Sequence, residues 1–143
     1  MSFDMRIDVA ETVDNIDEFA RLLPKAVGRG LYGWSEQVMT RAKGLCPVDT
    51  GTLRSSGHVS NPESKNGAME VTLGFGGPAG SGNHGGESNG EACGYAEYVH
   101  ENLAARHTTG QAKFLESPLM EATGQLSDQI QQEVDSDVKE VFK

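Results

Sequence analysis

Long apolar runs are missing from this sequence of 143 residues. No stretch approaches the ~20 consecutive apolar residues that a membrane-spanning helix needs. Residues 1–8 also lack the basic and apolar regions of a signal peptide. We therefore expect a soluble protein that is made in the cytoplasm.

Positive charge is scarce as well. Twelve Lys and Arg side chains stand against 21 Asp and Glu, which gives a formal net charge of −9. This balance opposes sequence-independent binding to a phosphate backbone, and the basic residues are scattered along the chain. We do not expect the protein to bind nucleic acid, and we expect no membrane partner.

The two cysteines, Cys46 and Cys93, are too few for a disulfide framework. They could pair only if the fold brought their Cα atoms within ~7 Å. In a cytoplasmic protein we expect two free thiols. Pro47 follows Cys46 directly and no base stands nearby in the sequence, which argues against a thiol nucleophile.

Catalytic motifs are also missing. Residues 76–94 are rich in glycine, but no Gly-Lys-Ser/Thr follows them as in a phosphate-binding loop. Asp49, Ser55, Ser56 and His58 are hydrolase residue types, yet Leu53 stands where a nucleophile elbow needs glycine. These patterns indicate neither a nucleotide-binding protein nor a serine hydrolase.

Four possible metal ligands are spaced too irregularly for a known zinc motif. A small metal-dependent enzyme would require some of them to converge in a pocket. We expect no enzyme, no cofactor and no metal. The four residues are His84, Cys93, His100 and His107.

The chain has the length of one domain, residues 1–143. Its 36% hydrophobic content is low and its 18 glycines are many, which is typical of long loops or of surfaces that neighbouring subunits complete. We expect an N-terminal arm or strand at 1–13, a helical part at 14–45, a sheet at 53–116 and a C-terminal helix at 117–143.

The helical part contains two expected helices. Asp14 or Asn15 caps the first, and Pro24 ends it or opens the next. The second covers about residues 25–43, because apolar residues recur there every three or four positions. They are Val27, Leu31, Trp34, Val38, Ala42 and Leu45.

A corner then turns the chain from helix to strand. Pro47 cannot continue a helix, and Asp49, Thr50 and Gly51 favour a tight turn. Leu53 is the first expected inward residue of a strand. Residues 53–60 and 68–75 are predicted to pair as antiparallel strands, because their connection is short and contains Asn66-Gly67.

Two further strands are expected, at 95–101 with Tyr98 facing the core and at 112–115. Ser117 is predicted to cap the last helix, with Pro118 at its first position. The expected fold is α+β: a small antiparallel sheet of about four strands packed against two main helices, with a long glycine-rich loop at 76–94. This loop is expected to make interfaces through Gly76, Gly80, Asn83, His84 and Asn89.

Three segments in order resemble the neck and tail-completion proteins of long-tailed bacteriophages, which are also called head-tail joining or minor capsid proteins. They lie at residues 47–53, 95–101 and 114–119, and the resemblance extends from about Leu31 to the final helix. The chain differs from the family in a longer, more glycine-rich segment before Tyr95. Besides the corner, the motif residues are Tyr95, Tyr98, Val99, Glu101, Phe114, Leu115, Pro118 and Leu119.

The resemblance implies a structural virion protein. Such a subunit forms a homo-oligomeric ring, hexameric or dodecameric, in the neck between head connector and tail, with DNA passing through its lumen. Its partners are connector or head-completion proteins and tail-tube or tail-terminator proteins. A tail terminator or minor tail protein that caps the tail tube is the alternative from the same assembly. We expect intersubunit or partner contacts from residues 1–9, 76–94 and 102–111.

Overall fold

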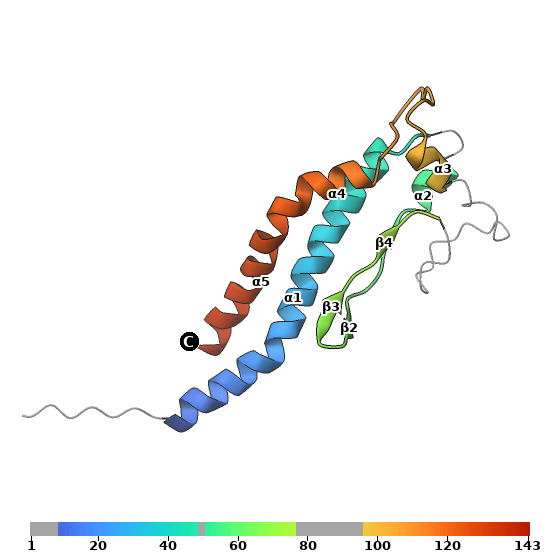
Figure 1. Ribbon diagram of the computed structural model, residues 1–143. Helices are drawn as coiled ribbons and strands as arrows, with labels where there is room; N and C mark the ends of the chain where they lie inside the picture. Colours follow the sequence, from blue (N-terminus) through green and yellow to red (C-terminus); the bar gives the residue numbers. More distant parts are fainter. Residues whose placement is uncertain (1–8, 49–50, 77–95) are drawn as a thin grey trace, which may run out of the picture.

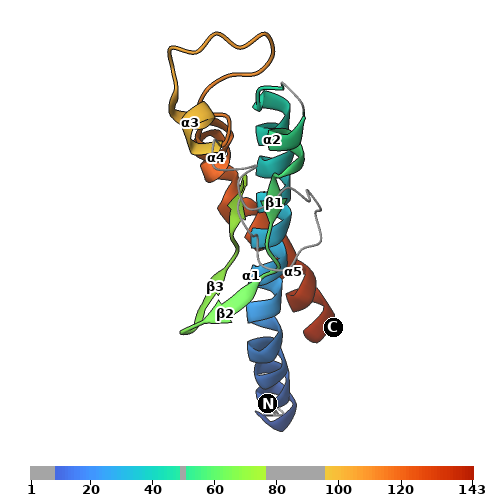
Figure 2. The same ribbon diagram turned by 90° about the vertical axis from the view of Figure 1, so that its right-hand side faces the viewer.

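The computed structural model describes residues 9–48, 51–76 and 96–143. Helix α1 (Val9–Leu45) is the spine of the molecule. Figure 1 shows α5 (Leu126–Val141) lying along one side of α1, and the strands along the other. Figure 2 shows the strands and the C-terminal helix on different sides of α1. The fold is mixed helix and strand, as the sequence predicts.

Helix α1 runs through Pro24, so the predicted break at this residue is wrong. Proline removes one backbone hydrogen bond and bends a helix. Figure 1 shows such a bend in the N-terminal half of α1. The helix continues because Ala26 and the residues after it are buried against other elements. It ends at Leu45, two residues before Pro47.

The corner leads into a short helix instead of a strand. Gly51 has a left-handed φ of 84° and precedes α2 (Thr52–Ser55). Leu53 is buried beside Cys46, but in a helical turn. The predicted strand at 53–60 therefore shrinks to β1 (His58–Val59). Asp49 and Thr50 lie outside the described residues.

Within residues 9–48, 51–76 and 96–143, the strands form two small antiparallel sheets and not one sheet of four. Strand β1 pairs with β4 (Leu73–Gly74), and β2 (Glu63–Lys65) pairs with β3 (Ala68–Glu70). Antiparallel pairing was predicted and is confirmed. Asn66 and Gly67 turn the chain with φ of 51° and 80°, as the Asn-Gly signal predicts. The two ladders are separated near Pro62, which has no N–H to donate.

The predicted strand at 95–101 is wrong, because α3 (Ala96–Glu101) is a helix. Ala96 and Val99 are three residues apart, and both join the cluster around Phe114. This helical spacing outweighs the strand propensity of Tyr and Val. Tyr98 is 69% exposed and does not enter the core. Residues 112–115 form turns and not a strand.

The last helix is divided in three. Helix α4 (Glu116–Ala122) is followed by the 3₁₀ turn η1 (Thr123–Gln125) and by α5. Because α4 begins at Glu116, Ser117 lies inside the helix and not at its cap. The interruption leaves the Ala122 carbonyl at a helix end, where the Trp34 indole donates to it at 2.8 Å.

In the part of the chain that the structure describes, two buried clusters stabilise the fold. One lies between α1 and α4: Trp34, Val38 and Ala122, with Leu31, Leu119 and Leu126 at its edge. The other joins the end of α1 to α2 and α3: Cys46, Leu53, Ala96 and Phe114, with Leu45, Phe75, Val99 and Leu115 at its edge.

Candidate functional site

Four charged or titratable side chains meet where α3 approaches α4. Lys113 Nζ lies 2.5 Å from Glu101 Oε2 and 2.8 Å from Glu116 Oε2. His100 Nδ1 lies 2.7 Å from Glu101 Oε1. We call His100, Glu101, Lys113 and Glu116 the α3–α4 polar cluster.

The spacing of ligand atoms in this cluster would suit a metal ion, but the ammonium group of Lys113 already contacts the carboxylates. Ligand atoms of His100, Glu101 and Glu116 lie within 4.8 Å of one another. However, the ammonium group of Lys113 already contacts both carboxylates. This ammonium group and the His100 ring lower the pKa of Glu101, and the carboxylates of Glu101 and Glu116 raise the pKa of Lys113.

The backbone also uses the cluster to join the two helices. Lys113 N–H donates to the His100 carbonyl at 2.7 Å, and Glu116 N–H donates to His100 Nε2 at 3.3 Å. The His100 ring packs edge-on against Phe114, with centroids 5.1 Å apart. Both ring nitrogens of His100 thus have a hydrogen-bond partner: Nδ1 contacts Glu101, and Nε2 accepts from Glu116 N–H. The arrangement holds α3 against the start of α4.

Of the four possible ligands that the sequence offers, His100 contributes to this cluster. Among the described residues, the ligand group does not include His107. His84 and Cys93 lie outside the described residues. Glu101 and Glu116 were not considered as ligands from the sequence, because only the turn at 112–115 brings them together.

The serine and histidine near the corner serve the backbone. Ser56 Oγ donates to the Leu53 carbonyl at 2.6 Å and accepts from Gly76 N–H at 3.0 Å. His58 Nδ1 lies 2.9 Å from the Ser56 carbonyl oxygen. Ser55 Oγ donates to the Thr52 carbonyl. These bonds do not form a nucleophile and base pair.

Cys46 is fully buried, and burial raises the pKa of its thiol to about 11. Such a thiol is almost entirely protonated at neutral pH and is a poor nucleophile. Cys46 belongs to the core.

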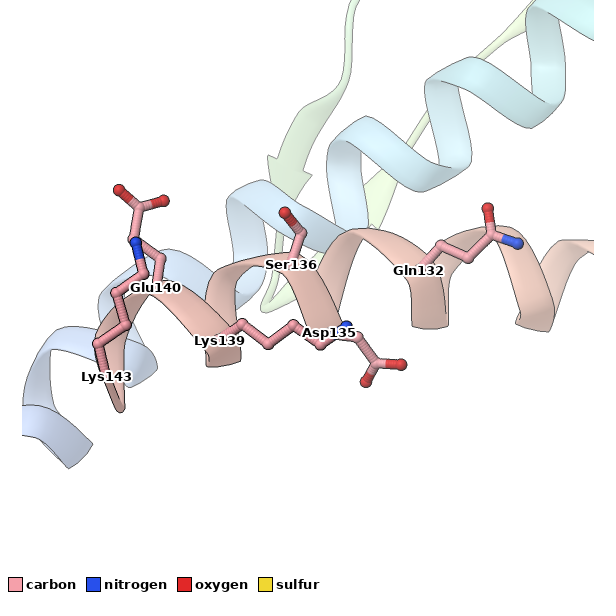
Figure 3. Close-up of a pocket in the computed structure, with 6 residues that line it drawn as sticks. All are labelled: Gln132, Asp135, Ser136, Lys139, Glu140 and Lys143. Carbon is pink, nitrogen blue, oxygen red and sulfur yellow. The ribbon is translucent and has the colours of Figure 1, made fainter.

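A surface depression lies on α5 (Figure 3). The labelled side chains rise from α5 and from Lys143, two residues beyond its end, with cationic and anionic groups alternating. Specific small-molecule sites need polar groups that converge in a concave, mostly apolar pocket. This surface does not offer that arrangement. The residues that line the depression are Gln132, Asp135, Ser136, Lys139, Glu140 and Lys143.

The N-terminal part of α1 exposes large apolar side chains. Val9, Val13, Ile16 and Leu23 are 64%, 48%, 52% and 36% exposed. Their spacing of four, three and seven residues places them on one side of the helix. We call these four residues the α1 N-terminal face. The sequence already carries this signal, but the interpretation of 14–23 as a separate short helix hid it.

A second exposed apolar pair lies at α3. Tyr98 is 69% exposed and Leu103, just after α3, is 77% exposed. We call Tyr98 and Leu103 the α3 patch. Figure 1 shows α3 and the N-terminus of α1 at opposite ends of the elongated molecule.

The remaining predicted site residues are mostly framework. Phe114 and Pro118 are buried, whereas Pro47, Val99, Leu115 and Leu119 are partly exposed. Gly76 is buried and bonded to Ser56. The other predicted interface or motif residues lie outside the described residues. They are Gly80, Asn83, His84, Asn89 and Tyr95.

Comparisons with protein-family models, with curated proteins and with solved structures find no match to this chain. Within the described ranges, no helix is long and apolar enough to cross a membrane.

Proposed function

We propose that this protein is a structural, non-enzymatic subunit that assembles with copies of itself into a ring in the neck of a long-tailed phage. The ring would join the head connector to the tail. The observation that carries the proposal is the pair of exposed apolar surfaces, the α1 N-terminal face and the α3 patch, at opposite ends of one subunit. Surfaces of this kind are typical of subunits that neighbours complete.

The resemblance to neck proteins supports the proposal through three segments that meet in space. Leu53, Val99 and Phe114, one from each segment, belong to the same cluster. The three segments thus have a common structural role, because each contributes an apolar side chain to the same cluster.

Charge supports a role around DNA without binding to it. The net charge is −9, and the outer side of α5 exposes Asp128, Asp135 and Glu140. Acidic side chains that line a lumen would repel the phosphate backbone and let DNA slide. Replacing these three acids by lysine should slow DNA passage through assembled necks, and unchanged passage would contradict this part of the proposal.

Binding to phage particles tests the proposal. Purified protein is mixed separately with connector-filled heads and with tails, and the pelleted particles are imaged by negative stain. We expect a ring on the connector of the heads, and heads without a connector serve as the control. Binding to tails alone would favour the tail terminator. Binding to neither particle would contradict a role in the virion.

A further inference from the structure

We propose that α5 is a hinged flap, which opens away from α1 as one unit about η1 while the rest of the described structure stays folded. This inference goes beyond the proposed function and does not depend on it. Figure 1 shows α5 lying along one side of α1, and the chain reaches it through α4 and η1. Opening would uncover the side of α1 that carries Gly30 and Gly33.

Helix α5 contributes little to the interior of the molecule. None of its 16 residues is buried, whereas the seven-residue helix α4 buries Pro118 and Ala122. Of α5, the two clusters of the described structure include only its first residue, Leu126, at the edge of the cluster around Trp34. The flap can therefore open without breaking either cluster. A unit with few buried apolar contacts has a low free energy of opening.

The side of α1 beneath α5 offers little apolar surface. Gly30 lies directly against the backbone of Ile130, and Gly33 lies against the Gln129 side chain. Because glycine has no side chain, Ile130 packs there against backbone, and it is only partly buried. Opening thus exposes less apolar area than the separation of two helices with large facing side chains would.

Two ion pairs join α5 to α1. Arg29 Nε lies 2.9 Å from Glu133 Oε2, and Arg29 Nη2 lies 2.8 Å from Asp137 Oδ1. The Arg29 side chain is 47% exposed, and ion pairs in contact with water contribute little to stability. Asp137 Oδ2 is buried and has no hydrogen-bond partner among the described residues. This oxygen regains water when the flap opens, which favours the open state.

The contacts near the two ends of α5 are exposed. Gln37 Nε2 donates to Gln129 Oε1 at 3.1 Å near its start. Just after its end, Phe19 packs edge-on against Phe142, with ring centroids 6.2 Å apart, and Phe142 is 47% exposed. Opening replaces the hydrogen bond between the two glutamines by hydrogen bonds to water, at a small net cost.

The hinge is η1, a 3₁₀ turn between two α-helices. Interruptions of this kind often mark hinges. Gly124 lies inside the turn, and nothing lies within 4 Å of its Cβ position. On the other side of the turn, the Trp34 indole donates to the Ala122 carbonyl and holds the end of α4 against α1. The chain is thus fixed before η1 and has room to turn within it.

Hydrogen exchange of the purified chain, followed residue by residue with mass spectrometry, tests the flap. After correction for intrinsic rates, amides of residues 130–138 should exchange at least about tenfold faster than those of residues 34–42 in α1. They should also share one common protection, because a single opening exposes them all. Equal protection of the two segments would overturn the proposal, and so would protection that falls steadily from residue 130 to the C-terminus, as in a fraying helix.

Arg29→Gln and Arg41→Gln form a matched pair of variants. Arg41 Nη2 lies 2.6 Å from Glu121 Oε2 and joins α1 to α4, so this ion pair stays intact when the flap opens. Arg29→Gln should speed the exchange of residues 130–138 about threefold or more, and Arg41→Gln should leave it unchanged. If both variants speed it equally, α5 exchanges only through unfolding of the whole subunit, and the proposal fails.

A covalent link between α1 and α5 provides a second readout. Arg29→Cys and Asp137→Cys are combined in a Cys93→Ser background, where Cys46 stays buried, and are joined by a short bismaleimide. The link should slow the exchange of residues 130–138 at least about tenfold relative to the same variant before linking. Unchanged exchange after linking would contradict an opening of α5 away from α1.

Discussion

Gly30 sets the distance between α1 and α5. A Cβ atom at this position would lie 2.7 Å from Ile130 Cα and 3.0 Å from Ile130 Cγ1. Because the closer atom is backbone, the two helices would have to move apart. The glycine therefore serves helix packing, although glycine weakens an isolated helix.

Gly30→Ala should lower the free energy of unfolding by about 1–3 kcal/mol, because overpacking outweighs the gain in helix propensity. Gly44→Ala is the control, since Gly44 lies in the same helix with nothing within 4 Å of its Cβ position. It should raise the free energy of unfolding by about 0.5–1 kcal/mol. Urea titrations followed by circular dichroism measure the free energy of unfolding of both variants. If Gly30→Ala raised it as Gly44→Ala does, the close contact of Gly30 with Ile130 would be contradicted.

Cys46 should resist alkylation in the folded protein. With its pKa raised to about 11, about one thiol in a thousand is ionised near pH 8, and no part of the residue is exposed. In a Cys93→Ser background, iodoacetamide should modify Cys46 at least about 100-fold more slowly in buffer than in concentrated urea. Mass spectrometry follows the reaction. Equal rates would mean that solvent reaches Cys46 in the folded protein, which would contradict its place in the cluster with Phe114.

Some residues were predictable and others were not. The Asn66-Gly67 turn follows from local backbone preference alone, and the structure has it. The strand-forming residues around Tyr98 predict a core position, but Tyr98 is exposed on a helix. The contact of Ala96 and Val99 with Phe114 favours a helix at residues 96–101. No local pattern reveals a contact so distant along the chain.

At the level of elements, the α3–α4 polar cluster joins two helices whose contact no sequence pattern predicts. His100 was visible as a possible ligand, but its partners depend on the turn before α4. Lys113 adopts a positive φ of 55°, which is uncommon outside glycine and asparagine. The turn therefore brings the ammonium group between Glu101 and Glu116.

The stability that the polar cluster contributes should depend on pH. The pKa of Glu101 is lowered in the fold, so its contribution is present above the ordinary glutamate pKa of about 4.3 and is lost as the pH falls through the lowered value. The pKa of Lys113 is raised, so its contribution is present below about 10.4 and is lost at higher pH.

Lys113→Met should therefore lower the melting temperature between about pH 5 and pH 10. The difference from the unmodified protein should shrink below about pH 4. Thermal melts across this range provide the measurement. Lys25→Met, at an exposed position on α1, is the control and should leave the melting temperature nearly unchanged at every pH.

Helix α1 combines a buried half with an exposed half. Val38 is fully buried, so Val38→Asp should cost several kcal/mol and unfold the subunit. Ile16 is 52% exposed, so Ile16→Asp should change the free energy of unfolding of the monomer by at most about 0.5 kcal/mol. Circular dichroism of dilute protein measures both variants. A folded Val38→Asp variant would contradict the position of α1 in the core.

The helical elements were only partly predictable. Apolar spacing identified residues 25–43 correctly, because burial follows that spacing. The same spacing runs back to Val9, but Pro24 suggested a break where the helix only bends. The last helix is divided at η1, next to the Ala122 carbonyl that accepts from Trp34, and no local pattern reveals this contact.

At the scale of the whole molecule, the central claim is that one subunit is incomplete. Among the described residues, most large buried side chains belong to two small clusters along a long helix, and exposed apolar surfaces remain at both ends. Under the proposed function, neighbouring copies would bury these surfaces, and the acidic charge would keep free subunits in solution before assembly.

The most direct test is the particle mass of the purified 15.3 kDa protein, measured by light scattering alone and after binding to connector-filled heads. We expect a mass gain on the heads that corresponds to six or twelve copies, whether or not the free protein is already a ring. A protein that stays at the mass of one subunit under both conditions would contradict the claim that copies of this chain complete each other.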